Sequence, residues 1–278
     1  MMQLRIKHST GYRYEKGAVA SFNEARMTPL TTPAQQVLRS RLDITPTPWT
    51  SEFRDYWGTT VTAFEVTEPH TELSVVATSL VETEEARVEP QGRPWSALAE
   101  VQDDLCEYLE LSDWVVPSVE LKQATASLRE TAATPTDFAR AVCTYLYEQI
   151  RYVTGATEVT TRAADAWDAR VGVCQDFAHL SLGLLRDAGI PARYVSGYLH
   201  PGSDPAVGEE VEGESHAWIE WWDGDWVGYD PTNDRPVGEQ HVVVARGRDY
   251  EDVPPLRGIY STRGDSELFV TVEITRMR

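Results

Sequence analysis

The stretch Gly172-Val173-Cys174-Gln175-Asp176-Phe177-Ala178-His179-Leu180 lies in the second half of the 278-residue chain. We expect a helix from Gly172 to Gly189, because apolar residues recur there at helical spacing and Gly189, followed by Pro191, is typical of a helix end. Cys174 then lies in the first turn, where unpaired backbone N–H groups and the helix dipole favour an anion. The stretch therefore predicts a reactive thiolate at a helix N-terminus.

Two later residues are suited to act with such a thiol. Ser215–Trp222 alternates as a strand with His216 on its even-numbered face, and Asp230 ends the next predicted strand. His179 is nearer in sequence, but five helical residues turn through about 500°, which places it about 140° around the axis from Cys174. Cysteine, histidine and aspartate in this order predict a nucleophile, a base and a residue that orients the base.

The turn between the two strands decides whether His216 and Asp230 share a face. A two-residue Asp223-Gly224 loop would place Asp230 on the opposite face. A three-residue Trp222-Asp223-Gly224 loop, with Gly224 in the left-handed conformation, would place Asp230 directly opposite His216. We expect the longer loop, or a compensating bulge at Gly228.

Composition limits the classes of partner. The formal net charge of −19 and the pI near 4.7 argue against nucleic acid and membrane surfaces as partners. The segment Met1–Thr10 has no long apolar run, so neither a signal peptide nor a membrane anchor is expected, and we predict a cytoplasmic protein. Three cysteines do not form a disulfide framework and fit a reducing compartment.

The first part of the chain has the period-two pattern of β-strands. We expect an antiparallel, sandwich-like β-domain over residues 1–90 and a catalytic core over residues 91–278, divided at the proline-rich Glu89–Pro94. The strands expected in the first domain are Gln3–Lys7, Arg39–Ile44, Thr60–Val66 and Glu72–Ala77.

The core is expected to place helices before antiparallel strands, which indicates an α+β fold. Further helices are predicted over Ser96–Glu110 and Thr136–Val153, which makes Cys106 and Cys143 core residues. The strands expected in this core are Arg193–Leu199, Ser215–Trp222, Asp225–Asp230, His241–Arg246 and Leu268–Thr275.

On these residues the sequence resembles the bacterial transglutaminase-like enzymes, relatives of papain-type cysteine proteases. The matching segments are Gly172–Ala178, Leu185–Tyr198, Ser215–Trp218, Asp230–Thr232 and Gly247–Pro255, and the N-terminal β-region is similar to the domain that usually precedes this core. The resemblance implies a papain-like core in which Cys174 is the nucleophile, His216 the base and Asp230 its orienting residue.

The implied chemistry is an acyl-enzyme formed at Cys174 from a peptide or protein carboxamide, which is then released to an amine co-substrate or to water. The Cys174 backbone N–H is a natural donor to the oxyanion. Trp167, Tyr152 and Gln175 are candidates for the second donor, and Trp218 and Tyr229, with Trp167, are candidates for substrate-binding walls. No cofactor or metal is implied, and the sequence contains no EF-hand spacing for calcium.

An acidic segment just before His216 is expected to be a solvated loop, and it is a candidate rim over the substrate. It contains Asp204, Glu209, Glu210, Glu212 and Glu214. Two other interpretations stay open. One is acyl transfer from a thioester, as in the arylamine N-acetyltransferases, and the other is a binding module without catalysis.

Overall fold

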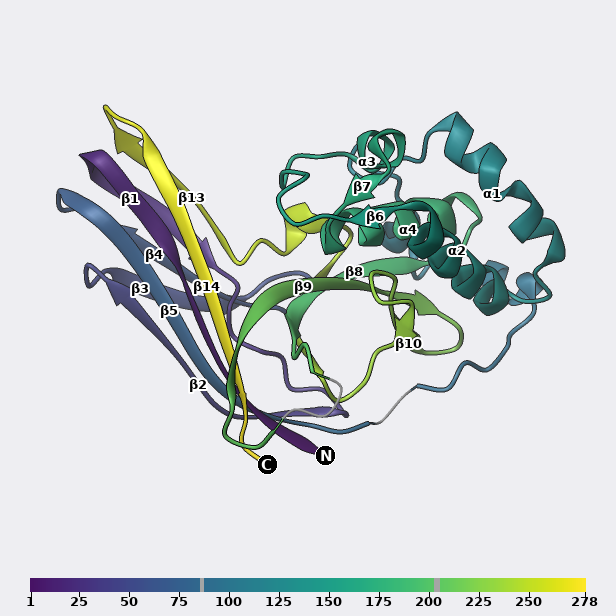
Figure 1. The fold of residues 1–278 in the computed structure, drawn as a ribbon, viewed down its shortest axis with the longest axis horizontal. Coiled ribbons are helices and arrows are strands. Elements are labelled where there is room, and N and C mark those ends of the chain that lie inside the picture. Colours follow the sequence, from purple (N-terminus) through teal and green to yellow (C-terminus); the bar gives the residue numbers. More distant parts are fainter. Residues whose placement is uncertain (86–87, 203–205) are drawn as a thin grey trace.

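The computed structural model describes residues 1–85, 88–202 and 206–278. Figure 1 shows the helices at one end of the molecule and long strands from both ends of the chain at the other. The N-terminal part contains β1 (Met2–Ala25), β2 (Gln35–Thr45), β3 (Trp49–Arg54), β4 (Thr60–Val66) and β5 (His70–Thr83). Two short 3-10 helices, η1 (Trp95–Glu100) and η2 (Cys106–Leu109), follow.

The remaining elements form the helical core, its strands and the C-terminal hairpin. They are α1 (Val119–Thr131), α2 (Pro135–Gln149), β6 (Arg151–Tyr152), α3 (Ala163–Ala169), β7 (Val171–Gly172), α4 (Cys174–Asp187), β8 (Ala192–Leu199), β9 (Glu210–Trp222), β10 (Trp226–Asp230), β11 (Arg235–Pro236), β12 (His241–Gly247), η3 (Tyr250–Asp252), β13 (Leu256–Thr262) and β14 (Ser266–Arg276). The α+β class predicted from the sequence is confirmed.

The strand β1 is the centre of the N-terminal sheet. Its first half pairs antiparallel with β5 and β14, and its second half pairs with β4 and β13. Leu4 and Ile6 are buried while Arg5 and Lys7 are exposed, as the alternating pattern requires. The four strands predicted in this region lie within β1, β2, β4 and β5 and are confirmed.

The C-terminal hairpin crosses the predicted division at Pro90. β13 and β14 fall in the predicted core, 91–278, yet both pair with β1 in the N-terminal sheet. Figure 1 shows these yellow strands beside the purple β1. The alternation of residues 268–275 predicts a strand but does not identify its partner, because the pairing joins opposite ends of the chain.

The strand β9 connects the two halves of the molecule. Glu210–Gly213 pairs with β14, and Glu214–Trp221 pairs with β8. An apolar cluster that joins Leu4 and Ile274 of the N-terminal sheet to Tyr198 and Val242 of the core covers this junction. His216 lies three residues beyond the part of β9 that pairs with β14, on a strand held at both ends.

The helix α4 is the centre of the helical core, with every residue from Gln175 to Arg186 buried. It ends before Gly189, whose φ of 82° is the left-handed conformation expected at a helix end. The prediction of a continuous helix over 96–110 is wrong. Only η1 and η2 form there, and neither contains a buried residue or a side-chain cap that would stabilise a longer helix.

The other predicted helix is α2, which ends at Gln149 rather than Val153 because Ile150 is already extended. Thr134 and Asp137 cap its start reciprocally. The helices α1 and α3 were not predicted. None of the described helices is long and apolar enough to span a membrane.

Candidate active site

Cys174 lies in the first turn of α4, as predicted, although the helix begins at Cys174 itself and not at Gly172. The chain enters through β7, and Val173 is the extended residue before the helix. Asp176 closes this first turn, because its Oδ2 accepts hydrogen bonds from the Val173 N–H at 2.7 Å and from the Thr157 hydroxyl at 2.6 Å. The Cys174 thiol is partly exposed at a rigid helix N-terminus.

His216 and Asp230 lie on the same face of the sheet, but the predicted register is wrong. The strand β10 is shifted along β9 by two residues, which is one position on that face. Trp222 pairs with Trp226 and Tyr229 with Ile219, so Asp230 lies diagonal to His216 and not directly opposite it. The three residues of the turn are Asp223, Gly224 and Asp225, and Gly224 is left-handed, with a φ of 88°. A three-residue turn starting one position later still preserves the shared face.

The Asp230 carboxylate is buried and accepts several hydrogen bonds. Oδ2 accepts from His216 Nε2 at 2.9 Å, from His241 Nε2 at 3.2 Å and from Asn233 Nδ2 at 2.7 Å. Oδ1 accepts from the backbone N–H groups of Thr232 and Asn233 at 3.0 and 3.2 Å. Burial alone would raise the pKa of Asp230, but the hydrogen bonds from the two histidines hold it well below its usual range.

His216 lies between this carboxylate and the thiol. Because Nε2 is bound to Asp230, the other ring nitrogen, Nδ1, is left for Cys174. Burial lowers the pKa of His216, but hydrogen bonds to Asp230 and Cys174, together with their charges, outweigh burial and raise it to about 10. The structure therefore brings together the three residues predicted to act together, in an arrangement that favours an imidazolium.

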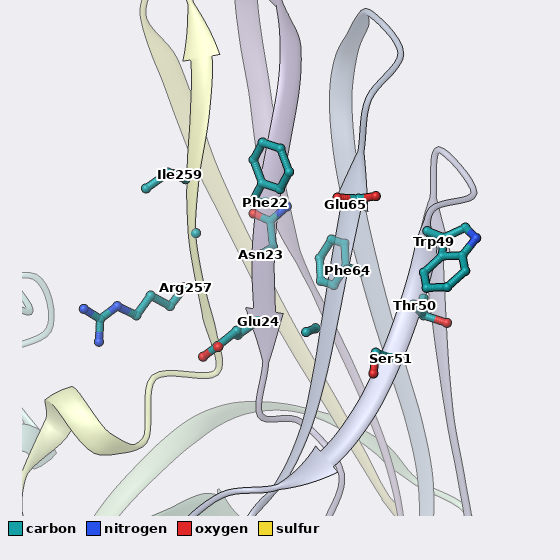
Figure 2. A pocket seen from close by; sticks show the side chains of 12 residues that line it. Phe22, Asn23, Glu24, Trp49, Thr50, Ser51, Phe64, Glu65, Arg257 and Ile259 are labelled. Carbon is teal, nitrogen blue, oxygen red and sulfur yellow. The ribbon is translucent and has the colours of Figure 1, made fainter.

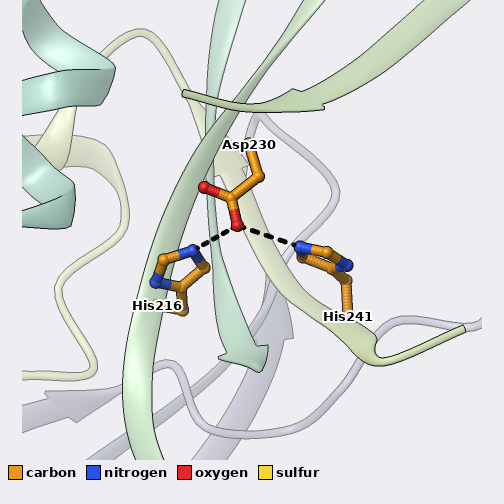
Figure 3. Close-up of side chains that lie close together, drawn as sticks. All are labelled: His216, Asp230 and His241. Carbon is orange, nitrogen blue, oxygen red and sulfur yellow. Dashed lines mark hydrogen bonds and ion pairs between the residues drawn. The ribbon is translucent and has the colours of Figure 1, made fainter. Parts of the chain in front are cut away.

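His241 is the site residue that the sequence reasoning missed. It opens β12, is 4% exposed, and lies on the far side of Asp230 from His216 (Figure 3). Its sequence signal is a single polar residue at the head of the apolar run His241-Val242-Val243-Val244. Such a residue on a buried strand needs a polar partner.

The trio of His216, Asp230 and His241 also has the residue types of a metal site, with candidate ligand atoms within 4.8 Å of one another. These residues fit a metal poorly. Both Nε2 atoms are within hydrogen-bonding distance of the same carboxylate oxygen, and a nitrogen that donates a proton cannot at the same time be a ligand.

The aromatic residues predicted to wall the substrate site are buried instead. Trp167 is 2% exposed in the helical core, and Tyr229 is 8% exposed with its hydroxyl donated to Asp234. Trp218 is fully buried, with its ring 6.2 Å from that of His216 and 5.3 Å from that of His241. Trp167 in α3 and Tyr229 in β10 belong to the apolar cluster of the helical core, whereas Trp218 packs beside the two histidines.

The candidates for a second oxyanion donor occupy different environments. Gln175 donates its amide to the Val159 carbonyl at 3.1 Å, so that group is already engaged, and Trp167 is buried. Tyr152 is 41% exposed and near enough to Cys174 for the sulfur's charge to contribute to its raised pKa, after burial. Of the three, Tyr152 is the exposed one, and its hydroxyl is donated to Glu214.

The acidic segment before His216 is mainly a strand, not the predicted loop. Asp204 lies outside the described residues, and Glu210, Glu212 and Glu214 belong to β9. Their even numbering places them on the face of His216. Glu214 accepts a hydrogen bond from the Tyr152 hydroxyl at 3.2 Å, so this end of the segment is held against Tyr152.

The remaining polar residues singled out from the sequence lie elsewhere. Cys143 is buried as predicted, but Cys106 is exposed, because the predicted helix around it does not form. His179 is buried and accepts the Tyr250 N–H at 3.2 Å. A shallow hollow of about 750 Å³ lies on the N-terminal sheet, between Phe22, Trp49 and neighbouring side chains, and none of the predicted site residues lines it (Figure 2).

Comparison with known families matches two separate segments of the chain. Residues 4–82 match the bacterial transglutaminase-like N-terminal region, and residues 122–231 match the transglutaminase-like superfamily. The chain belongs to this superfamily. The second match contains Cys174, His216 and Asp230, so these three residues lie in the part of the chain that carries the family's pattern.

Relatives of this transglutaminase-like chain include uncharacterized and named proteins. It is 45% identical to an uncharacterized protein of Mycobacterium leprae over the full length of both. It is similar to the crystal structure of a proposed cysteine protease from Cytophaga hutchinsonii, with a TM-score of 0.80 and 25% identity over 100% of this chain and 91% of that one. A protein-glutamine gamma-glutamyltransferase of Pseudomonas aeruginosa is 39% identical over 72 residues, 24% of this chain and 10% of that protein.

Proposed function

We propose that the chain is a cysteine enzyme that transfers or hydrolyses acyl groups of peptide and protein carboxamides, with Cys174 as nucleophile, His216 as base and Asp230 as the residue that orients the base. The observation that carries this proposal is the position of His216 between the Asp230 carboxylate and the Cys174 thiol. The family and the name of the Pseudomonas aeruginosa relative favour amides over thioesters as substrates.

In the first half of the reaction the Cys174 thiolate attacks the amide carbonyl carbon. The backbone N–H of Cys174 donates to the developing oxyanion, since it lies in the first turn of α4. His216 Nδ1 then gives its proton to the departing nitrogen, the C–N bond breaks, and ammonia or an amine leaves. The acyl group remains on Cys174 as a thioester.

In the second half an amine or water attacks this thioester. His216 Nδ1 takes the proton of the attacking group, and the C–S bond breaks to restore the thiolate. Asp230 stays ionised throughout and holds His216 through Nε2, so one ring nitrogen is fixed and the other moves the proton. An amine acceptor gives an isopeptide bond, and water gives hydrolysis.

The partners of this reaction are therefore a peptide or protein that bears an amide and, for transfer, a primary amine. The residues of the proposed reaction supply the nucleophile, the base and the oxyanion donor, and the mechanism assigns no step to a cofactor. We propose that the reaction takes place in the cytoplasm.

The test is mass spectrometry of a glutamine-containing peptide library incubated with the full chain, with and without a primary amine. We expect amine adducts, deamidation or backbone cleavage, each of which disappears in Cys174→Ala. Cys106→Ala is the matched control, because it removes an exposed thiol far along the chain, and it should behave as wild type. Modification that persists in Cys174→Ala would contradict the proposal.

A further inference from the structure

The side chain of His241 has two polar contacts that fix its protonation. Nδ1 accepts the backbone N–H of Gly238 at 3.2 Å, and an imidazole nitrogen that accepts carries no proton. The neutral ring therefore carries its proton on Nε2, which lies 3.2 Å from Asp230 Oδ2. His241 is thus a donor to the same oxygen that holds His216.

The surroundings of His241 keep the ring neutral. Burial lowers the pKa of His241, and the charges of His216 and Arg235 lower it further, against the opposing effect of Asp230. A neutral donor stabilises the carboxylate without cancelling its charge. The full negative charge of Asp230 then remains available to the imidazolium of His216.

The other donors to Asp230 come from its own turn. Thr232 and Asn233 are two and three residues away, so they fix the carboxylate relative to the end of β10. His241 starts β12, which pairs with β8, and β8 pairs with β9, the strand of His216. Among the described residues, His241 and His216 are the two donors to this carboxylate from outside the Asp230 turn.

The rings of the two histidines are held by one side chain. Trp218 lies beside His216, with an interplanar angle of 30°, and meets His241 edge to face at 73°. Because Trp218 is fully buried, neither imidazole can turn without disturbing the packing. The geometry therefore fixes the direction from which each Nε2–H approaches Oδ2 (Figure 3).

From this arrangement we infer that His241 is a positioning residue, which holds the Asp230 carboxylate in the orientation that receives the Nε2–H of His216. The inference rests on the proposed function. A purely structural histidine would need only to accept the Gly238 N–H through Nδ1, whereas a positioning residue must donate to Asp230 through Nε2. The two roles therefore depend on opposite ends of the same ring.

Two substitutions separate these ends. His241→Gln places an amide N–H near the position of Nε2 and can still donate to Asp230, whereas His241→Asn places a polar atom near Nδ1 and can serve only Gly238. We expect His241→Asn to lower kcat/KM by about tenfold or more, with KM little changed, and His241→Gln to stay within about threefold of wild type.

A substrate-independent measurement accompanies the kinetics, the rate of Cys174 alkylation by iodoacetamide as a function of pH. In His241→Asn the Asp230 carboxylate is held less firmly and stabilises the imidazolium of His216 less well. The step in the alkylation rate that marks deprotonation of His216 should therefore move to lower pH. His241→Gln should keep the wild-type profile. Thermal melts of both variants establish that each is folded.

The reverse pattern, with Asn near wild type and Gln impaired, would show a structural role and overturn the inference. Wild-type kinetics and alkylation profiles in both variants would overturn it equally. The Cys174→Ala variant keeps the two proposals apart. If amide modification survives in that variant, the proposed function fails, and if only the Asn and Gln variants fail to differ, the role of His241 alone is wrong.

Discussion

Trp222 lies directly opposite Trp226 across the turn between β9 and β10. The turn therefore contains three residues, and this odd number keeps Asp230 on the same face of the sheet as His216. With one residue fewer, every side chain of β10 would point to the other face. The geometry of the candidate site thus depends on the length of a turn that begins seven residues after His216 and ends five residues before Asp230.

Deletion of Gly224 tests this dependence. A two-residue turn should slip the register by one, move Asp230 away from His216 and lower amide modification by about a hundredfold or more, as expected when an orienting carboxylate is lost. Gly224→Ala is the matched control. It keeps the turn length, costs the strain of a φ of 88°, about 1 kcal/mol, and requires the Gln91 side-chain amide, 2.5 Å from the new Cβ, to shift. A folded deletion variant with wild-type activity would refute the register argument.

Gly197 provides the space for Trp218. It lies opposite His216 on β8, and a Cβ there would meet the Val242 carbonyl and come within 2.7 Å of the Trp218 ring. We expect Gly197→Ala to lower the free energy of unfolding in urea by about 1–3 kcal/mol and to lower activity, because Trp218 supports both histidines. Gly238→Ala, whose Cβ would meet nothing within 4 Å, should do neither. Equal effects of the two substitutions would contradict this account.

Glu220 forms a buried ion cluster on the face of β9 that also carries His216. Its carboxylate accepts from Arg193 Nε at 2.6 Å and from Arg246 Nε at 3.0 Å. Glu220→Gln leaves two guanidinium groups without their counter-charge and should lower the free energy of unfolding by about 3–5 kcal/mol. Glu212→Gln, an exposed residue on the same face, should change it by less than about 0.5 kcal/mol. Chemical denaturation of both variants measures the difference, and similar values would rule out the cluster as a source of stability.

The pKa of His216 predicts a pH dependence of stability. Because it is raised from 6.5 to about 10 in the folded state, its contribution is fully present below pH 6.5 and is lost as the pH rises toward 10. Asp230 remains ionised across this window, because its own pKa is held below the usual range. The free energy of unfolding of wild type relative to His216→Gln should therefore fall between pH 6.5 and pH 10. A difference that stays constant would mean that His216 is not held as an imidazolium.

The local features of the candidate site could be predicted from the sequence. Helical periodicity and the Gly189 stop place Cys174 at a helix start, and strand alternation places His216 on one face. These features depend on residues that are neighbours in the chain. The exact start of the turn after Trp221 could not be predicted, because Trp222 and Asp225 are both acceptable strand or turn residues.

The features that depend on distant contacts were missed. His241 reaches Asp230 through the packing of β12 on β8, and residues 210–213 become strand because β14 is available to pair with them. The buried positions of Trp167 and Tyr229 follow from the helical core that covers them. Periodicity along one segment does not specify which distant segment completes it.

The most direct test of the central claim is the rate of iodoacetamide alkylation at each cysteine, resolved by mass spectrometry at pH 6. An ordinary thiol is only about 0.3% thiolate at that pH, so an exposed but unactivated thiol reacts slowly. We predict that the partly exposed Cys174 reacts at least about tenfold faster than the exposed Cys106, and that His216→Ala removes this advantage. If Cys106 reacts faster than Cys174 in the wild-type chain, or if His216→Ala leaves the Cys174 rate unchanged, the thiolate–imidazolium site does not exist.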